Sequence, residues 1–186
     1  MASSFYSRDE LQELGLASFG NNVLISKKAS IYSASSIDIG DNVRIDDFCI
    51  LSGRIALGSN IHIGAFCALY GRFGIEMDDY TGLSPRTTIF SATDDFGGDF
   101  LISPMAPDEF TNVTGGLVKL EKYVQVGAGT IILPNITMQE GAATGSLTLV
   151  NKSLEPWTIY TGIPAKPLKA RKIGLLDKVK RIEDAR

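Results

Sequence analysis

The sequence has 186 residues, 44% of them apolar, and a formal net charge of −3. This length supports one domain with a sizeable core, and the near-balanced charge argues against a nucleic-acid-binding surface. No apolar run approaches the roughly 18–20 residues that span a bilayer, and the N-terminal segment lacks the basic start and apolar centre of a signal peptide, so we expect a single cytoplasmic domain over residues 1–186.

Residues 1–20 predict a helical cap. Ser7 and Glu10 have the spacing of a capping box, which would open a short helix that runs through Leu14 and ends at Gly15. Such a helix would cover the apolar end and the free strand edge of the structure that follows.

Residues 21–154 carry a six-residue repeat. One apolar position recurs as Ile25, Ile31, Ile37, Val43, Cys49, Ile55, Ile61 and Cys67. From Ile39 onward a second apolar residue follows two positions later, and this spacing of two indicates a strand. The period of six indicates that each strand is short and then turns. Three such strands would close one triangular coil, so the repeat predicts an all-β parallel β-helix in which side chains 18 residues apart stack about 4.8 Å apart.

A β-sandwich is the alternative, but sandwich strands do not hold one phase over eight consecutive hexads. In the β-helix, Cys49 and Cys67 point inward and lie 18 residues apart. We expect them to stack in adjacent coils as reduced core residues, because the cytoplasm keeps thiols reduced.

Two segments depart from the repeat. Residues 94–116 interrupt it with a loop too long to be a simple turn, and such loops are usually functional or mobile. Four apolar residues would pack this loop onto a neighbouring surface: Leu101, Ile102, Met105 and Phe110. Residues 155–186 form a tail in which Leu175 to Ala185 predict a charged amphipathic helix.

Three segments carry a resemblance to a known family. Residues 81–93, 124–135 and 160–167 are similar to the segment before the catalytic histidine, the coil after the loop and the terminal signature of galactoside and maltose O-acetyltransferases. The likeness extends to the capsule and O-antigen sugar acetyltransferases. It implies a left-handed β-helix, a homotrimer, and transfer of an acetyl group from acetyl-CoA to a hydroxyl or amine of a sugar, as in surface polysaccharide biosynthesis.

The residue that acts as the base is open. The resemblance puts the family's histidine at Asp94, and a carboxylate with a pKa near 4 is a weak base unless burial or the adjacent Asp95 raises that pKa. His62 is the only histidine, and it lies between inward-facing neighbours, so its ring should point outward. It is either a plain surface residue or a base. We expect His62 as the base and Asp94, with Asp95 next to it, to orient the acceptor or the histidine. A third possibility stays open, in which a neutral amine acceptor needs no base at all.

The resemblance also implies a coenzyme A site. The backbone near Gly127, Ala128, Gly145 and Ser146 would line pantetheine and donate an N–H to the oxyanion. Lys166, Lys169 and Arg171 would meet the adenosine phosphates, the alternative being a solvated tail.

A metal site is not expected. The carbonic anhydrases that share the β-helix bind zinc through three histidines, and this sequence has only one. Two other functions stay open: acetylation of a non-sugar acceptor such as serine or a drug, and a non-catalytic binding or scaffold role. Loss of the family's histidine favours the second, whereas the loop and the Pro-Ala-Lys tail oppose it.

Overall fold

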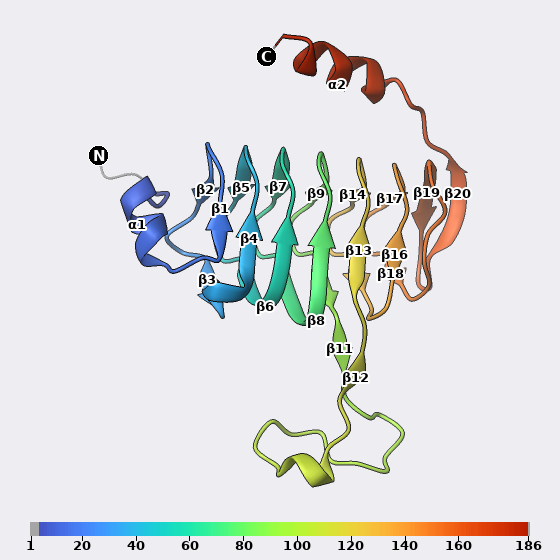
Figure 1. The fold of residues 1–186 in the computed structure, drawn as a ribbon. Helices are drawn as coiled ribbons and strands as arrows, with labels where there is room; N and C mark the ends of the chain where they lie inside the picture. The colour runs from blue at the N-terminus through green and yellow to red at the C-terminus, as the bar shows by residue number, and fades with distance from the viewer. Residues whose placement is uncertain (1–3, 186) are drawn as a thin grey trace.

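The computed structural model describes residues 4–185, and they form the left-handed parallel β-helix that the repeat and the resemblance predict. Figure 1 shows the coils stacked side by side, with helix α1 (Arg8–Glu13) at one end and helix α2 (Leu175–Glu183) above the coils. No helix in this part of the chain is long and apolar enough to cross a membrane.

Two sheets run along the stack. The first contains β1 (Ser18–Phe19), β3 (Ser30–Tyr32), β4 (Ile37–Ile39), β6 (Ile50–Leu57), β8 (Ala68–Met77), β10 (Thr88–Phe90), β13 (Val118–Leu120), β15 (Ile131–Ile132), β16 (Thr137–Met138) and β18 (Leu149–Val150). The second contains β2 (Leu24–Ile25), β5 (Val43–Ile45), β7 (Ile61–Ile63), β9 (Gly82–Leu83), β14 (Gln125–Val126), β17 (Ala143–Thr144), β19 (Thr158–Thr161) and β20 (Lys166–Ala170).

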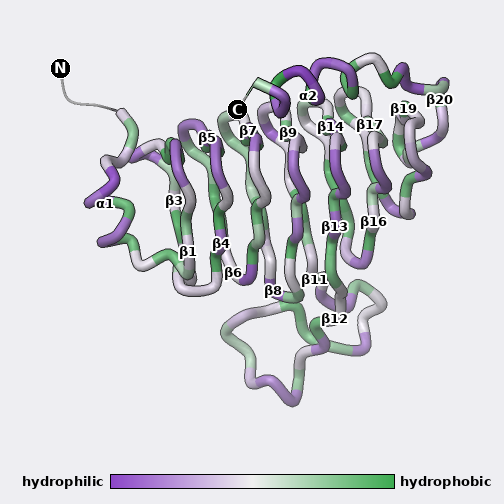
Figure 2. The backbone as a smooth tube through the Cα atoms, turned by 45° about the horizontal axis from the view of Figure 1, so that its top comes forward, coloured by the Kyte–Doolittle hydropathy of each residue, from purple (hydrophilic) through white to green (hydrophobic). Residues whose placement is uncertain are grey.

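The core is a column of aliphatic side chains inside the coils. Leu51 pairs in parallel with Leu69, and both are fully buried. Figure 2 shows hydrophobic and hydrophilic residues alternating along the coils, as expected for strands that bury every second side chain. The repeat therefore places one aliphatic face inward over most of the stack.

The first coil differs from the predicted phase. Ile25 pairs with Ile45, so the step between these coils is two residues longer than 18. A 3-10 helix over Ala34–Ser36 takes up the extra length, and by β4 the regular step has returned, with Ile37 paired to Ile55. The predicted two-residue slip after Phe73 is present, because Ile55 pairs with Ile75 across β6 and β8.

The parallel pairing extends beyond the predicted bounds of 21–154. β1 begins at Ser18 and pairs with β4, whereas β19 reaches Thr161 and pairs with β17. Tyr160 fills the inward position of that last coil and is only 8% exposed. An aromatic residue at this position breaks the aliphatic pattern, which is why the sequence did not show that the repeat continues beyond residue 154.

Elements outside the repeat lie at both ends of the stack. The predicted capping box is present, since Ser7 Oγ accepts from the Glu10 N–H at 3.3 Å and Glu10 Oε2 accepts from the Ser7 N–H at 2.7 Å. At the other end, β20 pairs antiparallel with β19 and is the last strand of the second sheet. α2 then turns back over the coils, where Tyr80 donates to Glu183 at 3.4 Å.

The long loop is an arm that leaves the coils on a short antiparallel ribbon of β11 (Ala92–Thr93) and β12 (Thr114–Gly115). Figure 1 shows it projecting away from the stack, and a 3-10 helix over Asp108–Phe110 lies within it. Its apolar residues are exposed in one chain, among them Leu101, Ile102, Met105 and Phe110. The arm thus carries an apolar surface that its own coils do not cover.

Candidate functional site

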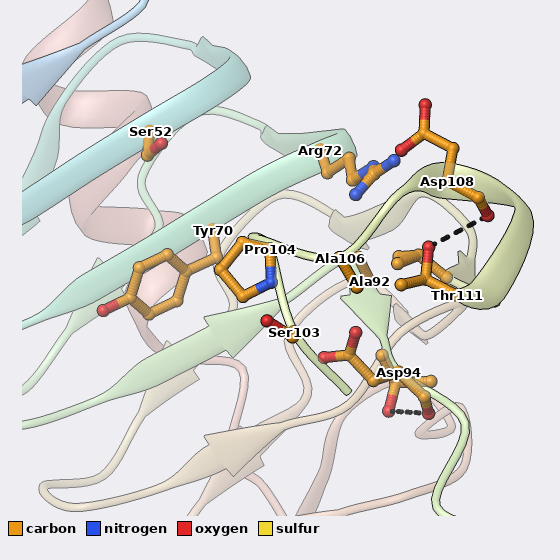
Figure 3. A pocket seen from close by; sticks show the side chains of 12 residues that line it. Ser52, Tyr70, Arg72, Ala92, Asp94, Ser103, Pro104, Ala106, Asp108 and Thr111 are labelled. Atoms are coloured by element: carbon orange, nitrogen blue, oxygen red, sulfur yellow. Dashed lines mark hydrogen bonds between the residues drawn. The ribbon is translucent and has the colours of Figure 1, made fainter. Parts of the chain in front are cut away.

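A hollow of about 800 Å³ lies where the arm leaves the coils (Figure 3). Tyr70 and Arg72 on β8 form its floor, Asp94 follows β11, and the arm supplies the opposite wall. A hollow of this volume can hold a cofactor or a nucleotide. The hollow contains one cation, Arg72, and two carboxylates, Asp94 and Asp108. A cation can recognise a phosphate, and a carboxylate can recognise an amine.

The two acidic residues at the start of the interruption, Asp94 and Asp95, are used differently. Asp94 lines the hollow, and Figure 3 shows its carboxylate turned toward the Ser103 side of the arm. Asp95 instead accepts a hydrogen bond from the Gly97 N–H at 2.7 Å, which fixes a local turn. Of the pair, Asp94 is the one available to a ligand.

A smaller hollow of about 340 Å³ lies over the second sheet and is lined by His62, Ser84 and Gln125. The ring of His62 points outward, as predicted, and its Nε2 lies 2.8 Å from Oδ2 of Asp46. Burial alone would raise the pKa of Asp46, but hydrogen bonds with His62 and Arg44 outweigh it and hold that pKa below its usual value. The hydrogen bond with the Asp46 carboxylate therefore holds the His62 ring in one orientation.

One chain does not bring His62 and Asp94 together. The two residues line different hollows, and these hollows share no lining residue. His62 lies on β7 in the second sheet, whereas Asp94 lies at the base of the arm. An active site that uses both would need two chains, with the face of one chain against the arm of another.

A corner of the coil next to the smaller hollow consists of Ser84, Gly127 and Gly145, stacked in successive coils. A Cβ on Gly127 would lie 2.4 Å from the carbonyl carbon of Gly145, so only glycine allows this stacking. Among residues 4–185, the N–H groups of Ala128 and Ser146 have no hydrogen-bond acceptor. Backbone donors without an acceptor therefore lie where the family resemblance implied the thioester and pantetheine.

The cations of the tail separate into two groups. Lys166 and Lys169 are exposed on β20 and are available to an anion. Arg171 is half-buried, and its Nη1 donates to the carbonyl oxygens of Tyr123 at 2.7 Å and Gly141 at 2.9 Å. That nitrogen ties the tail to the coil, which the sequence did not reveal because these contacts lie 30 or more residues away.

Cys49 and Cys67 are buried free thiols in adjacent coils, as predicted, with Ile50 paired to Ala68 beside them. Each thiol donates to a corner carbonyl at 3.2 Å, from Gly64 and Ser84 respectively. In the described residues there is no cluster of side chains suited to a metal ion.

Sequence reasoning missed Tyr70 and Arg72. Tyr70 stacks on Phe90 with ring centroids 5.3 Å apart, which makes an aromatic floor beside the hollow. Both residues lie on the coil just before the interruption and point outward. The sequence signal for this hollow was a large aromatic residue and a cation at outward positions, one coil before the long insertion.

No model of a known protein family matches the chain. It is 41% identical over 171 residues to the dTDP-4-amino-4,6-dideoxy-D-glucose acyltransferase of Escherichia coli, a match that covers 90% of this chain and 89% of that protein.

Solved structures extend this likeness. AntD, an N-acyltransferase from Bacillus cereus in complex with dTDP and 3-hydroxybutyryl-CoA, is 48% identical, with a TM-score of 0.96, and the match covers 99% of this chain and 98% of that one. A maltose O-acetyltransferase from Clostridium difficile 630 shares the fold at 23% identity, with a TM-score of 0.56 over 88% of this chain and 74% of its own.

Proposed function

The chain belongs to the hexapeptide-repeat acyltransferase family, and we propose that it transfers an acyl group from an acyl-CoA to the amine of a dTDP-linked amino sugar. The observation that carries the proposal is the likeness over nearly the whole chain to an N-acyltransferase that binds dTDP and 3-hydroxybutyryl-CoA. A variant of that relative also binds dTDP-4-amino-4,6-dideoxyglucose. The free backbone donors and the hollow with Asp94 are the features of this chain that suit such substrates.

An amine acceptor removes the difficulty raised by the missing histidine. The neutral amine attacks the thioester carbonyl, a C–N bond forms, and the C–S bond breaks. The nitrogen loses one proton and the departing sulfur of coenzyme A gains one, so no net proton is consumed. Because a neutral amine already carries its lone pair, this reaction depends more on positioning than on a strong base.

Asp94 is the residue that we assign to the amine. Its carboxylate lies in the hollow at the base of the arm and is turned toward Ser103. It would hold the amino group by a charge-assisted hydrogen bond. Arg72, in the same hollow, would meet the negative charge of a nucleotide diphosphate. This ranking reverses the one based on sequence, which favoured His62, because His62 lines the smaller hollow and is bound to Asp46.

The acyl-CoA is assigned to the corner of Ser84, Gly127 and Gly145. The N–H groups of Ala128 and Ser146 would bind the thioester oxygen or the pantetheine carbonyls. Lys166 and Lys169 would meet the phosphates at the far end of the cosubstrate. Arg171 contributes less to phosphate binding, since its Nη1 already donates two hydrogen bonds.

We further propose a homotrimer that acts in the cytoplasm in surface polysaccharide biosynthesis. Two observations support the assembly: the apolar side chains of the arm are exposed in one chain, and the two candidate hollows are separate. A neighbouring chain that covers the arm would bring its own smaller hollow, the one lined by His62, to Asp94. Light scattering at micromolar concentration should give three times the mass of one chain, and a monomer would contradict the proposal.

The decisive assay measures thiol release from acetyl-CoA and from 3-hydroxybutyryl-CoA with dTDP-4-amino-4,6-dideoxyglucose as acceptor. The matched control acceptor is the dTDP sugar with a hydroxyl in place of the amine. Mass spectrometry should show acylation of the amino sugar alone. Equal acylation of the hydroxyl sugar would point to O-transfer, and failure with both acceptors would overturn the proposed function.

A further inference from the structure

A line of small polar side chains runs inside the coils beneath the corner of Ser84, Gly127 and Gly145. Its members stack in successive coils, and each is at most 2% exposed: Cys49, Cys67, Thr87, Thr130 and Thr148. Elsewhere the core of the coils is largely aliphatic. Burying a hydroxyl costs free energy unless it is hydrogen-bonded, so the bonds that these threonines make explain their presence.

The hydroxyls hold the carbonyl groups of the corner. Gly145 O accepts from Thr148 Oγ1 at 2.9 Å and from Thr130 Oγ1 at 3.2 Å. Ser84 O accepts from Thr87 Oγ1 at 2.8 Å. These carbonyls therefore point into the core, toward the buried hydroxyls, and not toward solvent.

This orientation sets the direction of the next N–H group. A peptide unit is planar, and in its trans form the C=O and the following N–H point in opposite directions. With the Gly145 carbonyl bonded inward by Thr130 and Thr148, the Ser146 N–H must point outward. That N–H has no acceptor among the described residues, whereas at Ser84 the next residue is Pro85, which has no N–H to present.

Thr130 is itself held by further hydrogen bonds. Thr130 Oγ1 lies 3.3 Å from Thr144 Oγ1, and Thr144 Oγ1 accepts from the Gly127 N–H at 3.0 Å. The hydroxyl network thus connects two coils of the corner. A side chain in such a network has little rotational freedom, which is what holding a peptide plane requires.

We propose that Thr130 and Thr148 are positioning residues that hold the Gly145–Ser146 peptide so that the Ser146 N–H faces the acyl-CoA. This inference rests on the proposed function, because it takes the corner as the cosubstrate site. The threonines do not touch the cosubstrate. They act through the peptide group that does.

The test replaces both hydroxyls with methyl groups in the double variant Thr130→Val/Thr148→Val. We expect the Kd for coenzyme A and the KM for acyl-CoA to rise about tenfold, the factor expected for one or two lost hydrogen bonds. The KM for the amino sugar should stay within about twofold. The double variant Thr130→Ser/Thr148→Ser keeps both hydroxyls and should restore the Kd to within about twofold of wild type.

Ser26→Ala is the control. Ser26 is a buried hydroxyl residue of the first coils, and its Oγ donates to Oδ1 of Asp47, away from the corner of Ser84, Gly127 and Gly145. Its replacement should leave the Kd for coenzyme A unchanged. If the double valine variant does not fold, as judged by circular dichroism, Thr148→Val alone should raise the Kd about threefold, since Thr130 still bonds Gly145.

Three results would overturn the inference: an unchanged Kd in the valine variants, an equal rise in the KM of both substrates, or a serine variant as weak as the valine variant. The titration with coenzyme A separates the inference from the proposed function. Wild-type protein that binds coenzyme A but acylates no amino sugar refutes the function, and the effect of valine on the Kd still decides the inference. Wild-type protein that does not bind coenzyme A refutes both.

Discussion

Oδ2 of Asp46 lies 2.8 Å from Nε2 of His62, and the other carboxylate oxygen of Asp46 accepts from Nε of Arg44 at 2.7 Å. Asp46 follows the end of β5, and its carboxylate contacts Arg44 on β5 and His62 on β7. Hydrogen bonds with His62 and Arg44 lower the pKa of Asp46 despite its partial burial. A carboxylate whose pKa is lowered by folding stabilises the folded state when it is ionised.

Asp46→Asn should therefore lower the Tm at pH 7 by about 2–4 °C, which corresponds to about 1 kcal/mol for a chain of this size. The stabilisation is present above the unfolded pKa of about 3.9 and is lost as the pH falls through the lower folded pKa. Thermal melts between pH 7 and pH 3 should thus show the two proteins converging in acid. Asp99→Asn, at an exposed carboxylate of the arm, is the control and should show no such gap.

The thiols of Cys49 and Cys67 should be inert in the folded protein. The neighbouring thiol of Cys49 and burial both raise the pKa of Cys67, and the thiolate is the reactive form. The hydrogen bond with Cys67 lowers the pKa of Cys49, but the Cys49 side chain is fully buried, so burial keeps the reagent away from its sulfur. Alkylation at pH 8, followed by mass spectrometry, should label neither cysteine in native protein and both in denaturant. Rapid labelling of native protein would show that the coils open at this position.

Gly127→Ala should destabilise the coil. The added Cβ would lie 2.4 Å from the Gly145 carbonyl carbon, so the backbone of one coil must shift. We expect the Tm to fall by at least about 5 °C, because overpacking costs about 1–3 kcal/mol or more. Gly174→Ala is the matched control, since no atom lies within 4 Å of the Cβ it would add. An equal Tm for the two variants would contradict the close approach of the corners.

The fold was predictable because one physical pattern repeats. Ile37, Ile55 and Ile61 each report the same inward position, so a local irregularity such as the 3-10 helix at Ala34–Ser36 does not hide the architecture. The site was less predictable, because its parts come from different coils. Arg72 and Asp94 lie 22 positions apart in the sequence yet line one hollow. Nothing local to Arg171 indicated that its guanidinium would bond the carbonyls of Tyr123 and Gly141.

The backbone donors are an intermediate case. The resemblance pointed to the backbone near Ala128 and Ser146, and both N–H groups lack an acceptor among the described residues. The reason became visible only in three dimensions, because the hydroxyls that hold the adjoining carbonyls lie on Thr130 and Thr148 in the core. In the sequence, a threonine at the inward position is only a weaker match to the apolar repeat. Nothing in the pattern indicates that its hydroxyl bonds a carbonyl group.

The last prediction concerns the two residues that compete for the chemistry. Asp94→Asn should lower kcat/KM for the amino sugar about 10²-fold, because an amide lacks the charge that holds and orients the amine. His62→Ala should lower it less than about threefold, since a neutral amine needs no strong base and the ring is already bound to Asp46. In both wild type and His62→Ala, kcat/KM should rise with pH in parallel, following the neutral fraction of the amine. Initial rates of thiol release from pH 6 to pH 9 measure this directly. Loss of activity in His62→Ala, with near-full activity in Asp94→Asn, would reverse the ranking and identify the histidine as the base.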